Sequence, residues 1–222
     1  MPLKFTLTII LLLGSAFLCT AKPFDFKDPK GVNSIIFQMD APLESINGSA
    51  DGISGVVSFD PAKPEQTSGQ IILDASSLHV GNNVLKEHMH GKEWMNVVKY
   101  PSIRFNLSKL TDIKKKGMDL LALAEGKMTI RNITTHIQVP VKLTYLKDML
   151  IKRNRVPGDL LVIRAKFIVK RDDYNIQEGQ NLEKVANDIE ISLNLAGASP
   201  DQKCNIYPME KTAPSFLHPN KR

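Results

Sequence analysis

A repeated two-residue alternation of apolar and polar side chains constrains the fold of this chain more than any other feature. Successive side chains of a β-strand point to opposite faces, so this period is typical of strands with one buried face. Six segments show it clearly, with apolar faces that span Ile35–Met39, Ile71–Ala75, Ile103–Leu107, Ile137–Tyr145, Leu161–Val169 and Ile189–Leu195. Weaker strands are expected over Leu43–Ala50, Ile53–Phe59 and Leu120–Ile130. The chain is therefore predicted to be all-β.

Only a few places depart from this alternation. Asn82–Met95 has helical periodicity and predicts one short helical insert, and a weaker helical pattern covers Gln180–Ala186. Pro140 stands in the middle of a predicted strand, on its polar side. Because proline has no N–H to donate, we expect an edge, a bulge or a break in the sheet at this residue. Many antiparallel strands joined by polar turns indicate a β-sandwich or an up-and-down barrel, and the alternation does not separate the two.

The N-terminus has the pattern of a secretory signal peptide. Met1–Lys4 is positively charged, Phe5–Cys19 is mainly apolar, and the following Thr20-Ala21 offers a small residue for cleavage. A membrane span needs about 20 apolar residues, so we expect residues 1–21 to be removed near Ala21. The predicted location is periplasmic or secreted, with no membrane span in the mature chain. The alternatives are an uncleaved anchor and lipidation at Cys19, although Leu18 is larger than the residue that a lipoprotein signal prefers at that position.

The mature chain is long enough for one domain with a well-buried core, predicted over residues 22–196. Residues 197–222 contain four prolines and no periodicity, so they are expected to form a tail outside the barrel. Cys204 is then the lone cysteine, and an internal disulfide is excluded. Removing Lys4 from 29 basic residues leaves 28 against 23 acidic ones, a net charge of +5. This mild excess lacks the basic face with interleaved aromatics that nucleic-acid binding requires, so no nucleic-acid partner is expected.

The polar residues give little support to catalysis. His79, His88 and His90 lie close together in the sequence and could bind a metal if they shared a face, but a helix would separate them. The serines lack the context of an activated nucleophile, and the neighbouring Asp172 and Asp173 would point to opposite faces of a strand. We therefore predict no catalytic residue, no metal site, no cofactor and no enzymatic activity, and keep a histidine-based metal-binding protein as an alternative.

A series of short motifs resembles one family in order and spacing. The motifs are Gly55–Pro61 (GVVSFDP), Ala75–Leu78, His88 with Met89, Trp94, Tyr100–Phe105, Gly126–Asn132 and Arg171–Ile176. Together they resemble the YceI-like, lipocalin-like polyisoprenoid-binding proteins, over Asn33 to Leu195. The chain departs from the family pattern at Asn33, which replaces a histidine, and at Asn132 and Asn175, which replace glycines. Asparagine tolerates the left-handed backbone that glycine adopts, so these changes leave the expected fold intact.

The resemblance implies an extended eight-stranded antiparallel β-barrel that is lipocalin-like and binds a long-chain lipid or polyisoprenoid inside. On this interpretation the protein sequesters or shuttles a long apolar ligand, as a monomer or weak homodimer. The candidate cavity residues are the apolar faces of the clearest strands: Leu73, Ile103, Phe105, Leu107, Ile137, Val139, Val141, Leu143, Ile163, Phe167, Ile191 and Leu193. The alternation itself is equally compatible with a filled barrel that acts as an interaction or stress-response protein, with the tail as its working part. Trp94 and Tyr100 are expected to pack the helical insert onto the barrel or to gate the ligand.

Overall fold

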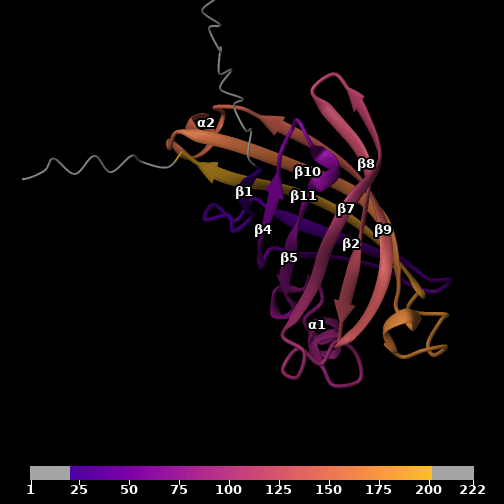
Figure 1. The fold of residues 1–222 in the computed structure, drawn as a ribbon. Helices are drawn as coiled ribbons and strands as arrows, with labels where there is room; N and C mark the ends of the chain where they lie inside the picture. Colours follow the sequence, from indigo (N-terminus) through magenta and orange to yellow (C-terminus); the bar gives the residue numbers. More distant parts are fainter. Residues whose placement is uncertain (1–20, 202–222) are drawn as a thin grey trace, which may run out of the picture.

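The computed structural model describes residues 21–201 and consists mainly of long antiparallel strands (Figure 1). The strands are β1 (Lys22–Asp25), β2 (Ser34–Asp40), β3 (Ser45–Ala50), β4 (Ile53–Phe59), β5 (Ser68–Asp74), β6 (His79–Val80), β7 (Ser102–Lys116), β8 (Asp119–Ile130), β9 (Ile133–Leu146), β10 (Gly158–Lys170) and β11 (Asp188–Pro200). The α-helices are α1 (Asn83–His90) and α2 (Leu150–Asn154). Three short 3₁₀ turns are η1 (Pro64–Gln66), η2 (Ala75–Ser77) and η3 (Asp172–Tyr174).

The strands close into an eight-stranded antiparallel barrel. One edge of β11 pairs with β10, and the other edge pairs first with β2 and then, at Ala198, with β1. On the next position of the barrel, β3 pairs with β2 and β4 pairs with β1. One position further, β6 pairs with β3 and β5 pairs with β4. The segments β1 and β2, β3 and β4, and β5 and β6 thus form three barrel strands that are each interrupted once, and β7 to β11 supply the other five. The predicted all-β, eight-stranded barrel is confirmed, and closure removes the exposed edges that an open sheet would present.

The helical expectations are only partly correct. The insert forms α1, which begins at Asn83 because the Asn82 side chain accepts a hydrogen bond from the Leu85 N–H at 3.0 Å. The segment Gln180–Ala186 forms turns and no helix, since its backbone is held by Arg171. A second short helix, α2, was not predicted, because five residues are too few to show a helical period. In Figure 1, α1 and α2 lie at opposite ends of the barrel.

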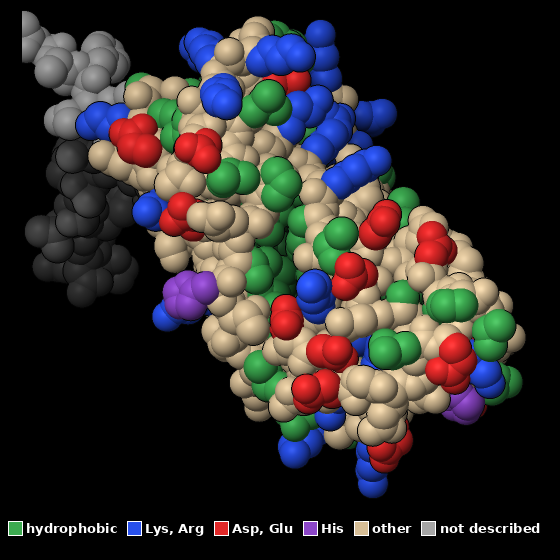
Figure 2. Space-filling model, turned by 90° about the vertical axis from the view of Figure 1, so that its right-hand side faces the viewer, with side chains coloured by type: hydrophobic (Ala, Val, Ile, Leu, Met, Phe, Trp, Pro, Cys, Tyr) green, Lys and Arg blue, Asp and Glu red, His purple; other side chains and the backbone are tan. Residues whose placement is uncertain are grey.

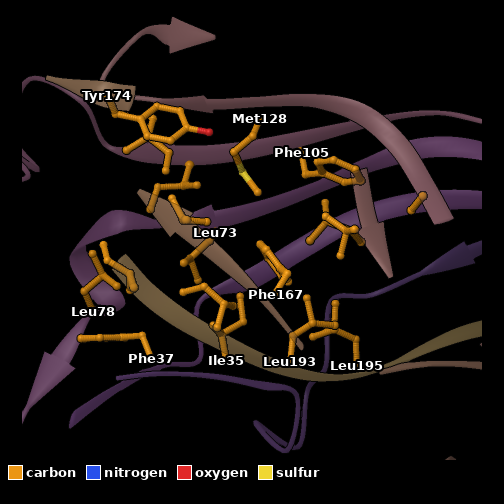
Figure 3. Close-up of a pocket in the computed structure, with 18 of the residues that line it drawn as sticks. Ile35, Phe37, Leu73, Leu78, Phe105, Met128, Phe167, Tyr174, Leu193 and Leu195 are labelled. Atoms are coloured by element: carbon orange, nitrogen blue, oxygen red, sulfur yellow. The ribbon is translucent and has the colours of Figure 1, made fainter. Parts of the chain in front are cut away.

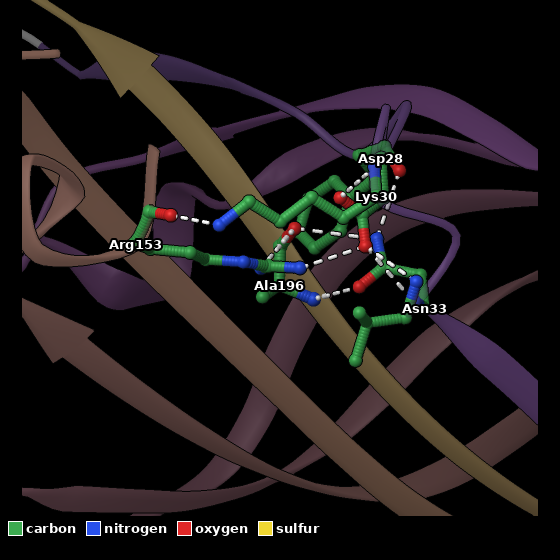
Figure 4. A network of polar contacts seen from close by, with 7 residues as sticks. Asp28, Lys30, Asn33, Arg153 and Ala196 are labelled. Carbon is green, nitrogen blue, oxygen red and sulfur yellow. Dashed lines mark hydrogen bonds and ion pairs between the residues drawn. The ribbon is translucent and has the colours of Figure 1, made fainter. Parts of the chain in front are cut away.

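A polar network replaces strand pairing where β1 gives way to β2 (Figure 4). Asn33 is only 3% exposed, and its side chain accepts from the Ala196 N–H at 2.8 Å and donates to the carbonyls of Phe26 and Ala196. Asp28 accepts hydrogen bonds from three backbone N–H groups of the connection between β1 and β2. It also forms an ion pair with Arg153 of α2 at 2.8 Å. Backbone N–H and C=O groups that would form hydrogen bonds with a neighbouring strand, if the strand were continuous, therefore form them with the side chains of Asp28 and Asn33.

The α2 end of the barrel is closed by aromatic rings around a buried carboxylate. Phe24, Phe59 and Tyr145 have ring centroids 6.1 to 6.4 Å apart. The Asp159 side chain is 1% exposed and accepts hydrogen bonds from Lys22, from the Tyr145 hydroxyl at 2.8 Å and from the Asp148 N–H at 2.9 Å. A buried carboxylate is stable only when it is satisfied in this way.

Acid should destabilise the fold through these two carboxylates. Burial would raise the pKa of Asp28 and of Asp159, but the hydrogen bonds and the nearby Arg153 and Lys22 outweigh it and hold both pKa values below their usual range. A carboxylate with a lowered folded-state pKa stabilises the fold above its unfolded pKa of about 3.9, and this stability is lost as the pH falls through the lower folded pKa. We expect the urea midpoint to fall between about pH 5 and pH 3. Asp159→Asn should reduce that pH dependence, and an unchanged profile in this variant would contradict the assignment.

The C-terminal boundary differs from the one expected. β11 continues to Pro200 and pairs with β10 to its end, and Ala198 also pairs with Asp25 of β1 to close the barrel. Gly197–Pro200 therefore belongs to the barrel. The prolines and the missing periodicity had predicted that the tail begins at Gly197. The predicted signal peptide, apart from Ala21, and the tail from residue 202 onward, including Cys204, lie outside the described residues.

Candidate functional site

The inward faces of the strands enclose an apolar cavity of about 230 Å³ (Figure 3). In the close-up, the aromatic and aliphatic side chains of Phe105, Phe167, Leu73, Ile35 and Leu193 project into a common space from strands on different sides of the barrel. Among the described lining residues, Trp94, Gln70, Arg171 and Tyr174 carry a polar side-chain group, and none of these groups presents polar surface to the cavity. Such a space suits a ligand with a long apolar portion, because it offers buried contact area and few directional partners.

The structure places eleven of the twelve predicted cavity residues in this lining. They are Leu73, Ile103, Phe105, Leu107, Val139, Val141, Leu143, Ile163, Phe167, Ile191 and Leu193. The exception is Ile137, which is not part of this lining and packs both against the main core and against the smaller cluster of Met128 and Tyr174. Whether the eleven residues contact a ligand stays a prediction.

Two glycines keep this space open. The ring of Phe105 lies over Gly126 of β8, where a β-carbon would be 2.8 Å from Cζ of the ring. Phe37 lies in the same way over Gly48 of β3. An aromatic side chain that covers a glycine on the next strand packs along the wall. Gly126 belongs to one of the motifs of the family resemblance, and because a β-carbon there would also lie 2.3 Å from the backbone oxygen of Asn106, a larger residue is expected to disturb this packing.

The end of the cavity near α1 is closed by residues that the alternation could not reveal. Met89 of α1 and Trp94 and Met95 of the following turns line the cavity from one side. Arg171, Tyr174 and Ile176 line it from the segment after β10. None of these residues lies in an alternating strand, and the available signal was the match of Trp94 and Arg171–Ile176 to family motifs. Ile35 and Phe37 of β2 also line the cavity, and their alternation was visible in the sequence.

Arg171 holds the closing segment in place. Its side chain is buried, and all of its nitrogens donate to backbone carbonyls between Ile176 and Ala186. The Trp94 ring lies 5.7 Å from the guanidinium carbon, a cation–π contact that ties this segment to the turns after α1. Burial lowers the pKa of Arg171, but arginine remains charged at neutral pH. Trp94 thus packs the insert onto the barrel, while Tyr100 contacts Lys99 and Arg131 and does not line the cavity.

Tyr174 fixes the same segment to the barrel wall. Its side chain is buried, and its hydroxyl is 2.6 Å from the hydroxyl of Thr135 on β9. Burial raises the pKa of Tyr174, so the phenol is neutral at physiological pH and can donate this hydrogen bond. A nearby bond, from Arg131 to the Asn175 carbonyl at 2.9 Å, joins the β8–β9 turn to the same segment.

The histidines and acidic pairs do not assemble into a reactive site. His79 and His88 are exposed, and the His90 Nε2 atom is 2.8 Å from the Leu78 carbonyl. Asp172 and Asp173 lie in η3, and Asp172 accepts from the Gly179 N–H. Within residues 21–201, no three His, Cys, Asp or Glu side chains are placed to hold a metal ion. In the same range, no helix combines the length and hydrophobicity that crossing a bilayer requires.

Comparison with known proteins connects the barrel to a family. The model of the YceI-like domain matches residues 30–196. A UPF0312 protein of Yersinia pestis (strain Pestoides F) is 26% identical over 150 residues, which cover 68% of this chain and 72% of that protein. A UPF0312 protein of Pseudomonas savastanoi pv. phaseolicola is 28% identical over 94 residues, 42% of this chain and 47% of that protein.

Solved structures share the fold. Burkholderia cenocepacia BcnA superposes with a TM-score of 0.60 at 23% identity, over 74% of this chain and 95% of that one. A polyisoprenoid binding domain from Saccharophagus degradans, implicated in plant cell wall breakdown, has a TM-score of 0.59 at 13% identity, over 82% of this chain and 99% of that one. The family model covers most of the chain and the barrel has the same architecture as these structures, so the resemblance in the motifs is confirmed: the chain belongs to the YceI-like family.

Proposed function

We propose that this protein binds one long apolar molecule, a long-chain lipid or polyisoprenoid, inside the barrel. The observation that carries the proposal is the apolar cavity, which is lined from almost every strand and closed at the α1 end by Trp94 and the segment after β10. The ligand is held and released without any bond being made or broken. The solved polyisoprenoid binding domain with the same fold supports this class of ligand.

Apolar burial is expected to be the main source of the affinity. Removing about 300 Å² of ligand surface from water contributes about 7.5 kcal/mol, from which the cost of immobilising the ligand is subtracted. Because a Kd of 1 μM corresponds to a net gain of about 8.2 kcal/mol, binding at that level needs either a larger buried area, which a longer chain provides, or an added polar contact. The signal-like residues 1–21 support a role outside the cytoplasm, in which the protein sequesters the ligand or shuttles it through an aqueous compartment. We expect the binding unit to be a monomer or weak homodimer.

Trp94 provides a direct test, because it is the single tryptophan of the chain and lines the cavity. Adding geranylgeraniol to the delipidated protein, residues 22–222, should change the intensity and wavelength of Trp94 emission and saturate at about one ligand per chain. Native mass spectrometry of the untreated protein, followed by organic extraction, should show a co-purified long-chain lipid.

The absence of lipid binding would contradict the proposal. A protein that carries no lipid, and whose Trp94 emission is unchanged by geranylgeraniol and by long-chain fatty acids, is a filled barrel. Its function would then have to lie on its surface or in residues 202–222, and deleting those residues would be the next measurement.

A further inference from the structure

The barrel wall is hydrogen-bonded over only part of the boundary between β9 and β10, which we call the seam. The two strands pair only from Val141–Leu146 with Leu160–Ala165, and beyond this point each pairs with its other neighbour alone. The β8–β9 ladder includes Pro140, whereas the last β9 residue that pairs with β10 is the neighbouring Val141. Proline has no N–H for the ladder, so the separation begins where the sequence predicted a break. Towards the α1 end, the Tyr174–Thr135 hydrogen bond ties the two sides together again.

The seam lies beneath a surface hollow that shares lining residues with the cavity. The shared residues are Val141 and Leu193. Figure 2 looks onto the side of the molecule where β9 lies in Figure 1, and shows a hollow with hydrophobic side chains at its floor. Both ends of the barrel are packed, one by the Phe24–Phe59–Tyr145 cluster and the other by Trp94 and Arg171. The seam is therefore the place where a bound molecule can extend to solvent.

The outer part of this hollow is positively charged. Its charged lining residues in the described part of the chain are Lys142, Arg164 and Lys166, with no carboxylate among them. Lys142 pairs with Asp119 at 3.3 Å, whereas Arg164 and Lys166 are exposed and form no ion pair within 4 Å among residues 21–201. The acidic side chains on the adjoining strands are Asp119 and Glu125 of β8, and Asp188 and Glu190 of β11. Arg164 and Lys166 thus lie at the edge of the hollow without a direct ion pair, and Asp119 is near enough to Arg164 to interact with it electrostatically.

We propose that the ligand is an anionic amphiphile, whose apolar chain fills the cavity and whose phosphate or carboxylate head leaves through the seam to contact Arg164 and Lys166. This inference rests on the proposed function and narrows it from apolar molecules in general to those with a negatively charged head. Arginine binds phosphate and carboxylate oxygens through two parallel hydrogen bonds, and Lys166 adds a second charge on the same strand face. Asn194, which pairs with Arg164, and Ser192, which pairs with Lys166, supply neutral donors on β11.

The test compares two ligands with the same chain, geranylgeranyl phosphate and geranylgeraniol, by titration of Trp94 emission. At low salt the wild-type protein should bind the phosphate at least about tenfold more tightly than the alcohol. In Arg164→Gln/Lys166→Gln this preference should fall to about twofold or less, with alcohol affinity unchanged, because the substitutions remove charge outside the cavity. The control Lys27→Gln/Lys63→Gln makes the same change of charge in the loops after β1 and β4 and should keep the preference.

Each outcome decides a different point. Equal affinity of the wild-type protein for phosphate and alcohol overturns the anionic head and leaves the proposed lipid binding intact. A phosphate preference that survives Arg164→Gln/Lys166→Gln overturns the seam as the exit, and its loss in Lys86→Gln/Lys92→Gln would place the head at the α1 end. If neither ligand changes Trp94 emission, the proposed function fails and this inference fails with it.

Discussion

Ile163→Trp is expected to lower lipid affinity at least about tenfold while leaving the barrel folded. Ile163 lies on β10, faces the cavity and is only partly buried, because the space in front of it is open. The larger ring fills volume that the ligand would occupy, and it introduces no charge and removes no backbone hydrogen bond. Since an added ring must find room inside a packed barrel, we expect a modest loss of about 1–3 kcal/mol in folding stability.

The matched control is Ile168→Trp on the same strand. Ile168 is 55% exposed and faces outward, so its replacement should change neither binding nor stability. Binding to both variants is measured by native mass spectrometry with geranylgeraniol, because the new tryptophan would obscure the signal of Trp94. Circular dichroism and a urea titration establish that each variant is folded. A folded Ile163→Trp protein that takes up the ligand like the wild type would show that the ligand binds elsewhere.

Arg171→Met should have the largest effect on stability of the changes considered. The substitution keeps most of the apolar stem but removes every donor to the carbonyls of Ile176, Gln177, Gln180, Val185 and Ala186. A buried polar group left without its partner costs about 1–3 kcal/mol, and water entering the loosened segment recovers part of the total. We expect the free energy of unfolding to fall by about 3–5 kcal/mol.

Ligand retention should fall with it, because the segment that Arg171 holds closes the α1 end of the cavity. Arg171→Lys keeps the positive charge but not the planar set of donors, so it should restore only a part of the stability. Arg104→Met removes an exposed arginine from the outer face of β7 and should change stability by no more than about 0.5 kcal/mol. Urea denaturation of the three variants checks the order. A wild-type midpoint in Arg171→Met would mean that the segment is held by its other contacts, including Tyr174 and Thr135.

The candidate site was largely predictable from the sequence because it is built from strand faces. The two-residue period shows which side chains share a face, and for Phe105, Val141 and Leu193 that face is the cavity. Ile137 has the same period but lies outside the lining, and it packs against the cluster that contains Tyr174. The α1 end could be assigned only through family motifs, because Trp94 and Arg171 stand in turns that carry no periodicity.

The sequence by itself determined the longer strands, most of their inward faces and the irregularity at Pro140, since each depends on local backbone chemistry. β1 and β6 are too short to show the alternation. Only the tertiary structure decided that the sheet closes as a barrel. It also decided where the β9–β10 pairing ends and which end of the cavity the segment held by Arg171 closes. Closure depends on the pairing of β11 with both β1 and β2, and Asn33 completes it through Ala196, 163 residues away. A local period contains no information about which distant strand supplies the partner, because every strand edge presents the same N–H and C=O groups.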